Sequence, residues 1–134
     1  MSKGEEKIIS LLKKGKYKFE REKSFKDLKH GAYRFDFYVQ RGRAKPCLIE
    51  FQGQQHYQYI PKFYRSRAEF KSAQERDRRK ISYCLAHDIP LYIIPYWEID
   101  GLRSASDLFQ TRFLAYTRWK NDKDWKRYRN LTFL

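Results

Sequence analysis

Hydrophobic and polar residues alternate most regularly over Tyr33–Val39 (YRFDFYV). Successive side chains of a β-strand point to opposite faces, so this pattern predicts a strand with Phe35, Phe37 and Val39 on one face. Asp36 then lies on the other face, together with its polar neighbours. The segment is the clearest prediction of a strand in the chain.

A second strand is expected over Cys47–Gln52, after a turn of sequence QRGRAKP. In the resulting hairpin Tyr38 pairs with Leu48, and Asp36 lies opposite Glu50. Opposed side chains of paired strands have Cβ atoms roughly 4.5–5.5 Å apart. Two carboxylates at that distance repel each other unless a cation lies between them or one stays protonated. The hairpin therefore creates a place for a cation.

The remaining elements complete an α/β pattern. Apolar residues at helical spacing predict a first helix over Glu5–Lys14 and a long one over Arg65–His87, whose inward stripe passes through Asp77. Further elements are expected in this order: a strand around residues 17–22, a short apolar strand of the kind found mid-sheet over 91–95, and a helix over 104–120. This order predicts one α/β domain over residues 1–134, with a mixed central β-sheet flanked by helices. Its core spans about residues 5–97, and a basic, aromatic C-terminal part spans about 104–134.

The amino-acid composition indicates which class of molecule the protein binds. The 134 residues are 41% hydrophobic and 18% aromatic, which is too apolar for a disordered chain. Lysine and arginine number 30 against 16 acids, giving a net charge of +14 at pH 7. This imbalance predicts a polyanionic partner, with nucleic acid ahead of membrane lipid. No membrane-spanning segment or signal peptide is recognisable, so we expect a cytoplasmic protein. That the cell is bacterial or phage-infected is implied only by the resemblance described below.

Asp36, Glu50 and Gln52 form a pattern of one acid followed, on the next strand, by acid-x-Gln. Such a pattern suits metal-dependent phosphodiester cleavage, in which the two acids bind Mg²⁺ and the third residue, usually lysine, orients water or phosphate. Mn²⁺ is expected to substitute for Mg²⁺. The alternative is that both acids are solvent-facing residues of the sheet, and a helix covering that face would argue against it.

His56 follows the second strand of the hairpin directly, in the sequence GQQH. It lies beside the two acids, and the inward Asp77 could hold one of its ring nitrogens. An imidazole oriented by a carboxylate can act as a general base near neutral pH. This position therefore favours a general base over an ordinary surface histidine.

Positive charge is concentrated in two segments. Residues 62–80 contain eight Lys or Arg against three acids, and residues 112–129 contain seven against two. The aromatics of the second segment, Trp119, Trp125 and Tyr128, either stack on bases or pack the last helix onto the sheet. The side chains expected to contact DNA phosphates are Arg34, Arg41, Arg43, Arg65, Arg67, Lys71 and Arg78.

Four segments, in this order, resemble a known group of nucleases. Residues 6–12 (EKIISLL) and 75–82 (ERDRRKIS) are similar to two helices of the very-short-patch mismatch repair endonucleases. Between them, RFDF and IEFQGQQH match the EDxHD homing endonucleases of phages and mobile elements. Both groups belong to the PD-(D/E)xK nuclease superfamily. The resemblance covers about residues 5–97 and implies a restriction-endonuclease-like fold and a Mg²⁺-dependent DNA endonuclease.

The resemblance also implies individual roles. Asp36 would be the principal metal ligand and Glu50 a second one, while His56 would be the base or water-positioning group with Asp77 as its partner. Glu6, or another acid in its place, would hold metal-bound water from the first helix. The Cys/His zinc site of the mismatch repair enzymes cannot be assembled here, so mismatch recognition is not inherited.

Two other functions stay open at this point. A non-catalytic, basic nucleic-acid-binding module is favoured by Gln52 standing where lysine is usual. A structure-selective nuclease, acting on junctions, flaps or mismatches, is favoured by the lack of a separate recognition module. The sequence also leaves open whether two copies pair as a homodimer to cut both strands.

Overall fold

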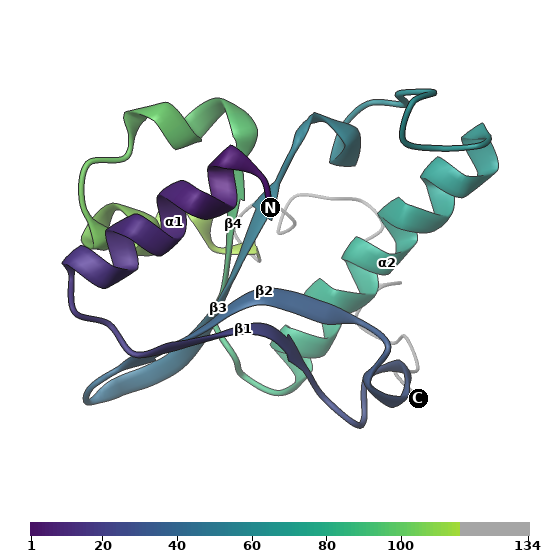
Figure 1. The fold of residues 1–134 in the computed structure, drawn as a ribbon. Coiled ribbons are helices and arrows are strands. Elements are labelled where there is room, and N and C mark those ends of the chain that lie inside the picture. Colours follow the sequence, from purple (N-terminus) through teal and green to yellow (C-terminus); the bar gives the residue numbers. More distant parts are fainter. Residues whose placement is uncertain (116–134) are drawn as a thin grey trace.

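The computed structural model describes residues 1–115 of the chain. Within them, four strands form one mixed β-sheet with the order β1-β2-β3-β4 (Figure 1). The strands are β1 (Phe19–Ser24), β2 (Arg34–Arg41), β3 (Ala44–Gln52) and β4 (Leu91–Pro95). The first three are antiparallel, whereas β3 and β4 are parallel and are joined through helix α2 (Arg67–Ala86). The predicted α/β class with a mixed central sheet is confirmed.

The β2–β3 hairpin is tighter than the predicted turn. Both strands extend into the segment predicted to be the turn, as far as the pair Arg41–Ala44. Gly42, between them, has a φ of 62°, a conformation that favours glycine. Tyr38 pairs with Leu48, as predicted. Because Phe37 also pairs with Ile49, the next position of the ladder brings Asp36 opposite Glu50. Local sequence has therefore set the register that matters for the site.

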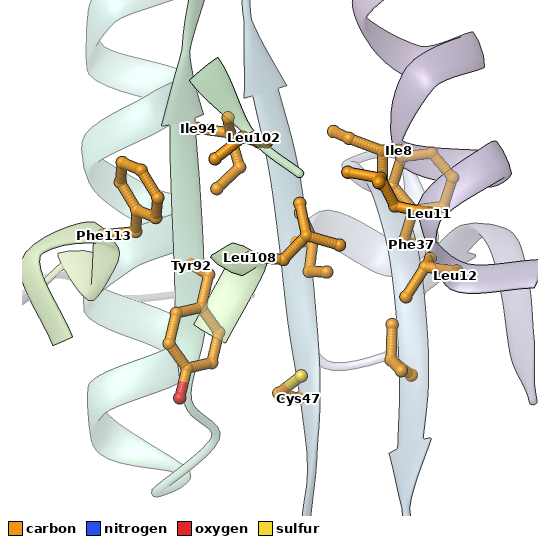
Figure 2. Packing of buried hydrophobic residues seen from close by; sticks show 12 residues of the cluster. Ile8, Leu11, Leu12, Phe37, Cys47, Tyr92, Ile94, Leu102, Leu108 and Phe113 are labelled. Atoms are coloured by element: carbon orange, nitrogen blue, oxygen red, sulfur yellow. The ribbon is translucent and has the colours of Figure 1, made fainter. Parts of the chain in front are cut away.

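Helix α1 (Lys3–Lys14) and α2 cover opposite faces of the sheet (Figure 1). On the α1 face, β2 and β3 contribute alternate residues to a buried cluster with the helix and with short turns that follow β4 (Figure 2). Its members include Ile8, Leu11, Leu12, Phe37, Cys47, Ile49, Ile94, Leu108 and Phe113. The opposite face of β3, which carries Leu48, packs with Ile81 and Cys84 of α2. Glu50 lies on this second face, under α2.

The N-terminus of α1 approaches β3 unusually closely. Ser2 caps the helix by accepting a hydrogen bond from the N–H of Glu5 (3.1 Å). Gly4 is buried, and a Cβ at this position would lie 2.3 Å from the ring of Phe51. Only glycine therefore allows this turn of the helix to lie against the strand, and the contact fixes which side chains of α1 face the sheet.

Three expectations need correction. β4 is an edge strand and not a central one. All five of its residues are nevertheless buried, because α2 packs on one face of the strand and the turns after β4 pack on the other. Tyr92 also forms a β-bridge with Leu114. Phe35 was expected on the same face as Phe37, but it is buried with Leu28 in the cluster on the α2 side of the sheet.

The third correction concerns the expected helix over 104–120, since residues 104–113 form two short 3-10 turns, Ala105–Phe109 and Thr111–Phe113, in place of an α-helix. The side chain of Asp107 accepts hydrogen bonds from the N–H groups of Arg103 and Ser104 and closes the first turn. Gln110 is then extended, which separates the two turns. Residues 116–120, Trp119, Trp125 and Tyr128 lie outside the described residues. Neither α-helix in the described part of the chain is long and apolar enough to cross a membrane.

Candidate active site

Asp36 and Glu50 are joined crosswise by main-chain hydrogen bonds. The N–H of Asp36 donates to Oε1 of Glu50 (2.8 Å), and the N–H of Phe51 donates to Oδ2 of Asp36 (2.8 Å). Glu50 is only 6% exposed. The pair is therefore neither solvent-facing nor loosely held, and the interpretation of both acids as ordinary surface residues is wrong.

Lys80 supplies a cation at this pair. Its Nζ lies 2.9 Å from Oε2 of Glu50 and 2.6 Å from the carbonyl oxygen of Arg34, and its side chain is 10% exposed. The sequence predicted that two such acids need a cation, and the chain provides one from α2. Breaking a buried ion pair of this kind by removing one partner costs about 3–5 kcal/mol, because the other charge is left buried.

His56 lies in a 3-10 turn (Gln54–His56) at the end of β3. Its Nδ1 is 2.9 Å from Oδ2 of Asp77, which projects from α2, so the expected pairing is present. With the Nδ1–H donated to the carboxylate, Nε2 carries the lone pair of the neutral ring. This is the arrangement of an oriented general base.

All these side chains line one cavity of about 740 Å³. It lies between the start of α1, the hairpin strands β2 and β3, the turn after β3, and α2. The charged lining residues are Glu5, Arg34, Asp36, Glu50, His56, Arg76, Asp77 and Lys80. The cavity thus combines four carboxylates with an imidazole and three basic groups, in a space large enough for a phosphodiester.

Glu5, and not Glu6, is the acid that α1 contributes. Glu6 is exposed and is absent from the lining, whereas Glu5 lines the cavity and forms an ion pair with Arg21 of β1 (2.9 Å). Adjacent residues of a helix point about 100° apart, so only one of the two can face the sheet. The close approach of Gly4 to Phe51 selects Glu5.

Gln52 does not take the third position of the motif within this cavity. It is buried on β3, on the same face as Glu50, but lines a neighbouring cavity of about 150 Å³ together with His56 and Asp77. A residue of α2, Lys80, contacts Glu50 instead.

The electrostatics of the cavity shift three pKa values. Burial, and then the charge of Glu50, raise the pKa of Asp36 to about 7. Burial also raises the pKa of Glu50, although the charge and the hydrogen bond of Lys80 oppose it. Burial lowers the pKa of His56, but the hydrogen bond and charge of Asp77 outweigh it and leave that pKa above its usual value. The site is therefore poised to exchange protons near neutral pH.

The acids fit a lightly ligated divalent cation. Among residues 1–115 there is no group of three or more His, Cys, Asp or Glu side chains that could hold a metal ion. Mg²⁺, however, often binds through one or two carboxylates, with waters and substrate phosphates as its other ligands. Within the described residues Oδ1 of Asp36 accepts no hydrogen bond, and both oxygens of Glu50 already accept one. Asp36 is thus better prepared than Glu50 to bind a cation.

The arginines and the lysine expected to contact DNA fall into two groups. Arg34 lines the cavity, and Arg65, Arg67, Lys71 and Arg78 lie in or before α2. Arg41 and Arg43 are at the far end of the hairpin, so the structure does not bring them to the acids. Arg41 is moreover half-buried and engaged within the fold, because it donates to the hydroxyl of Tyr92 (3.1 Å) and to the carbonyl of Lys45 (2.9 Å).

Sequence reasoning missed Lys80, Arg76 and Glu5. Lys80 and Asp77 are three residues apart, and residues at this spacing share a face of a helix, so an inward Asp77 should have directed attention to Lys80. The sequence leaves Arg76 and Glu5 indistinguishable from their charged neighbours. Only the packing of each helix on the sheet selects them.

Comparison with known proteins adds one viral relative. No protein family and no solved structure matches the chain. Over 48 residues, 36% of the chain, it is 35% identical to Uncharacterized protein 307L of Invertebrate iridescent virus 6. The matched part is 24% of that protein's length. Since the viral protein is itself uncharacterized, the similarity brings neither an activity nor a partner.

Proposed function

We propose that this protein is a metal-dependent DNA endonuclease of the PD-(D/E)xK superfamily. One observation carries the proposal: the crosswise-bonded Asp36 and Glu50 share a cavity with His56, whose imidazole a third carboxylate, Asp77, orients. The resemblance of four ordered segments to the EDxHD and very-short-patch repair nucleases agrees with it, as does the net charge of +14. The reaction is hydrolysis of a phosphodiester.

In this reaction the oxygen of a water molecule forms a bond to phosphorus as the bond from phosphorus to the leaving sugar oxygen breaks. The proton of the water passes to Nε2 of His56, and the leaving oxygen takes a proton from solvent. Asp77 holds the ring of His56 and stabilises the imidazolium that forms. Glu5 is placed to orient water from the α1 side of the cavity.

Mg²⁺ or Mn²⁺ would be held by Asp36, with Glu50 as the second carboxylate. When bound, the cation would supply neutralisation of the phosphate charge and activation of water. Binding needs the ionised form of Asp36, whose pKa is raised to about 7, so metal affinity is expected to weaken in acid. The crosswise hydrogen bonds hold the two carboxylates in place before any metal binds.

Arg34 and Arg76 provide contacts for the phosphates that flank the scissile one. Both line the cavity and are exposed, and neither forms an ion pair among the described residues. Guanidinium groups bind phosphate oxygens through paired hydrogen bonds, and each such contact contributes to salt-dependent affinity. We therefore place the DNA backbone across the mouth of the cavity, between β2 and α2.

The test is conversion of supercoiled plasmid to open-circle and linear forms with Mg²⁺, Mn²⁺ or EDTA. Wild-type protein should cut only with metal, and Asp36→Ala should abolish cutting while retaining DNA binding. Asp100→Ala serves as the matched control because Asp100 is exposed and outside the cavity. The ratio of open-circle to linear product reports whether one strand or two are cut.

Cutting that survives in Asp36→Ala, with a contaminating nuclease excluded, would refute the mechanism. Branched, flapped and mismatched duplexes should be included, because two exposed aromatic residues lie at or near the site: Phe63 lines the cavity, and the ring of Trp97 contacts that of Tyr57, the residue after His56. Preference for such substrates would identify a structure-selective nuclease.

A non-catalytic nucleic-acid-binding module is the second candidate. It is favoured by the Lys80–Glu50 ion pair, which partly neutralises the acids without any metal. On this alternative, binding of plasmid and branched DNA should be salt-sensitive and independent of Mg²⁺, and no substrate should be cut.

A further inference from the structure

The site lacks a lysine where the phosphodiester-cleavage pattern usually has one, and Gln52 in that position does not line the main cavity. The charge of that lysine is nonetheless present. Lys80 brings an ammonium group to Glu50 from a different element, the helix that covers this face of the sheet. The two residues are 30 positions apart in the chain, so no strand motif includes them both.

The position of this ammonium group is closely fixed. It donates to Oε2 of Glu50 and to the carbonyl oxygen of Arg34, and Nζ lies 4.8 Å from the centroid of the Phe35 ring. Lys80 lines the cavity together with Asp36, His56 and Asp77. An ammonium has three N–H donors, and Glu50 and Arg34 use two of them. The third can serve a ligand in the cavity.

We propose that Lys80 is a catalytic residue whose ammonium contacts a non-bridging oxygen of the scissile phosphate, in place of the lysine that position 52 lacks. This inference rests on the proposed endonuclease function. The negative charge on the phosphoryl oxygens is stabilised best by a donor that is already held in place, because no reorganisation is then needed during the reaction. Glu50 and the Arg34 carbonyl hold Lys80 in this way. Glu50 consequently has two functions, as an anchor for Lys80 and as a second carboxylate for the cation.

The test compares Lys80→Gln with wild type in single-turnover cleavage. Glutamine keeps two N–H donors for Glu50 and the Arg34 carbonyl but removes the charge. We expect the rate to fall about 100-fold, as when one donor to a developing oxyanion is removed. Mn²⁺ affinity, measured by calorimetry, should stay the same or increase, because a positive charge has left the site. Lys13→Gln, an exposed charge removal on α1, is the matched control.

Slower cleavage with unweakened metal binding separates a catalytic role from a structural one, since a distorted site would lose both together. A second readout uses a duplex with one methylphosphonate at a mapped cleavage position. The methylphosphonate removes the negative charge of one non-bridging oxygen. If the ammonium of Lys80 contacts that oxygen, this change should slow cleavage by wild type more than cleavage by Lys80→Gln. If Lys80→Gln does not fold, comparing Glu50→Gln/Lys80→Met with Glu50→Gln isolates the contribution of Lys80.

The outcomes are distinguishable. If wild type cuts and Asp36→Ala does not, but Lys80→Gln cuts at the wild-type rate, the role of Lys80 is refuted and the nuclease stands. Loss of cleavage in proportion to loss of Mn²⁺ binding likewise overturns it in favour of a structural role. If wild type cuts no DNA with either metal, the proposed function fails, and this inference fails with it.

Discussion

Nδ1 of His56 lies 2.9 Å from Oδ2 of Asp77, and the two residues are 21 positions apart in the chain. The contact joins the turn after β3 to the middle of α2 and determines how the imidazole faces the cavity. Because Asp77 favours the charged ring, the pKa of His56 is raised even though burial acts in the opposite direction. The effect of Asp77 on the pKa of His56 and on stability can be measured without knowing the substrate.

Asp77→Asn should lower the pKa of His56, because the hydrogen bond and charge that favour the imidazolium are removed. An NMR titration of the His56 ring, assigned with His56→Gln, measures the change. A base must be neutral, so at saturating metal, where Asp36 stays ionised, cleavage should rise as pH increases through the pKa of His56, and the rise should move to lower pH in Asp77→Asn. Asp27→Asn is the control, since Asp27 lies 3.0 Å from Nε2 of His87 and should leave His56 unaffected. An unchanged His56 titration in Asp77→Asn would contradict the assignment.

The same pair makes stability depend on pH. The pKa of His56 in the folded protein is above the value in the unfolded chain, so its contribution is present below about pH 6.5 and is lost as pH rises through the folded value. Asp77→Asn should therefore reduce the free energy of unfolding more in acid than in base, by about 1 kcal/mol at about pH 5.5. Urea denaturation at about pH 5.5 and 8.5 tests this, and an equal loss at both would exclude a titrating pair.

Asp36→Asn should stabilise the metal-free protein while abolishing cleavage. Burial and the charge of Glu50 raise the pKa of Asp36 to about 7, above its value in the unfolded chain. Such a carboxyl group favours folding in acid, and this advantage is lost as pH rises from about 4 through 7. In EDTA at about pH 8 we expect Asp36→Asn to gain about 1–2 kcal/mol, or roughly 3–10 °C in Tm. At about pH 4 the gain should vanish; a variant less stable than wild type at both pH values would contradict this account.

Gly4→Ala should destabilise the fold, although alanine is the better helix former by about 1 kcal/mol. A Cβ at position 4 would lie 2.3 Å from the ring of Phe51, so α1 must move away from β3. We expect a net loss of about 1–3 kcal/mol in thermal or urea unfolding, as for other overpacked cores. Ser10→Ala, at an exposed position of α1, should by contrast be neutral or stabilising. Since α1 also carries Glu5, Gly4→Ala should slow cleavage as well.

Glu50→Gln should cost about 3 kcal/mol in the free energy of unfolding, because the buried ammonium of Lys80 loses its carboxylate. Glu50→Gln/Lys80→Met removes both charges and should recover most of that loss. Urea denaturation of both single variants, the double variant and wild type yields the interaction energy of the pair. Additive effects would show that the two side chains do not interact.

The sequence by itself determined the hairpin and the placement of its acids. Side chains of a strand alternate with a period of two, so the pattern around Phe37 and the short turn fixed the register that sets Asp36 opposite Glu50. The inward position of Asp77 also followed from helical periodicity, and its contact with His56 from the position of that histidine after β3. The register of the hairpin depends on residues close together in the chain. The contact of His56 with Asp77 joins residues 21 positions apart, but the place of each residue follows from its own predicted element.

Tertiary packing decided the remainder. Glu5 and Glu6 are equivalent in a sequence pattern, and the contact of Gly4 with Phe51 chooses between them. Lys80 enters the cavity because α2 crosses the same face of the sheet that carries Glu50. β4 is apolar although it lies at the edge of the sheet. It can be so because α2 covers one of its faces, and α1 and the turns after β4 cover the other. In each case the deciding contact joins segments far apart in the chain, and such contacts leave no local pattern.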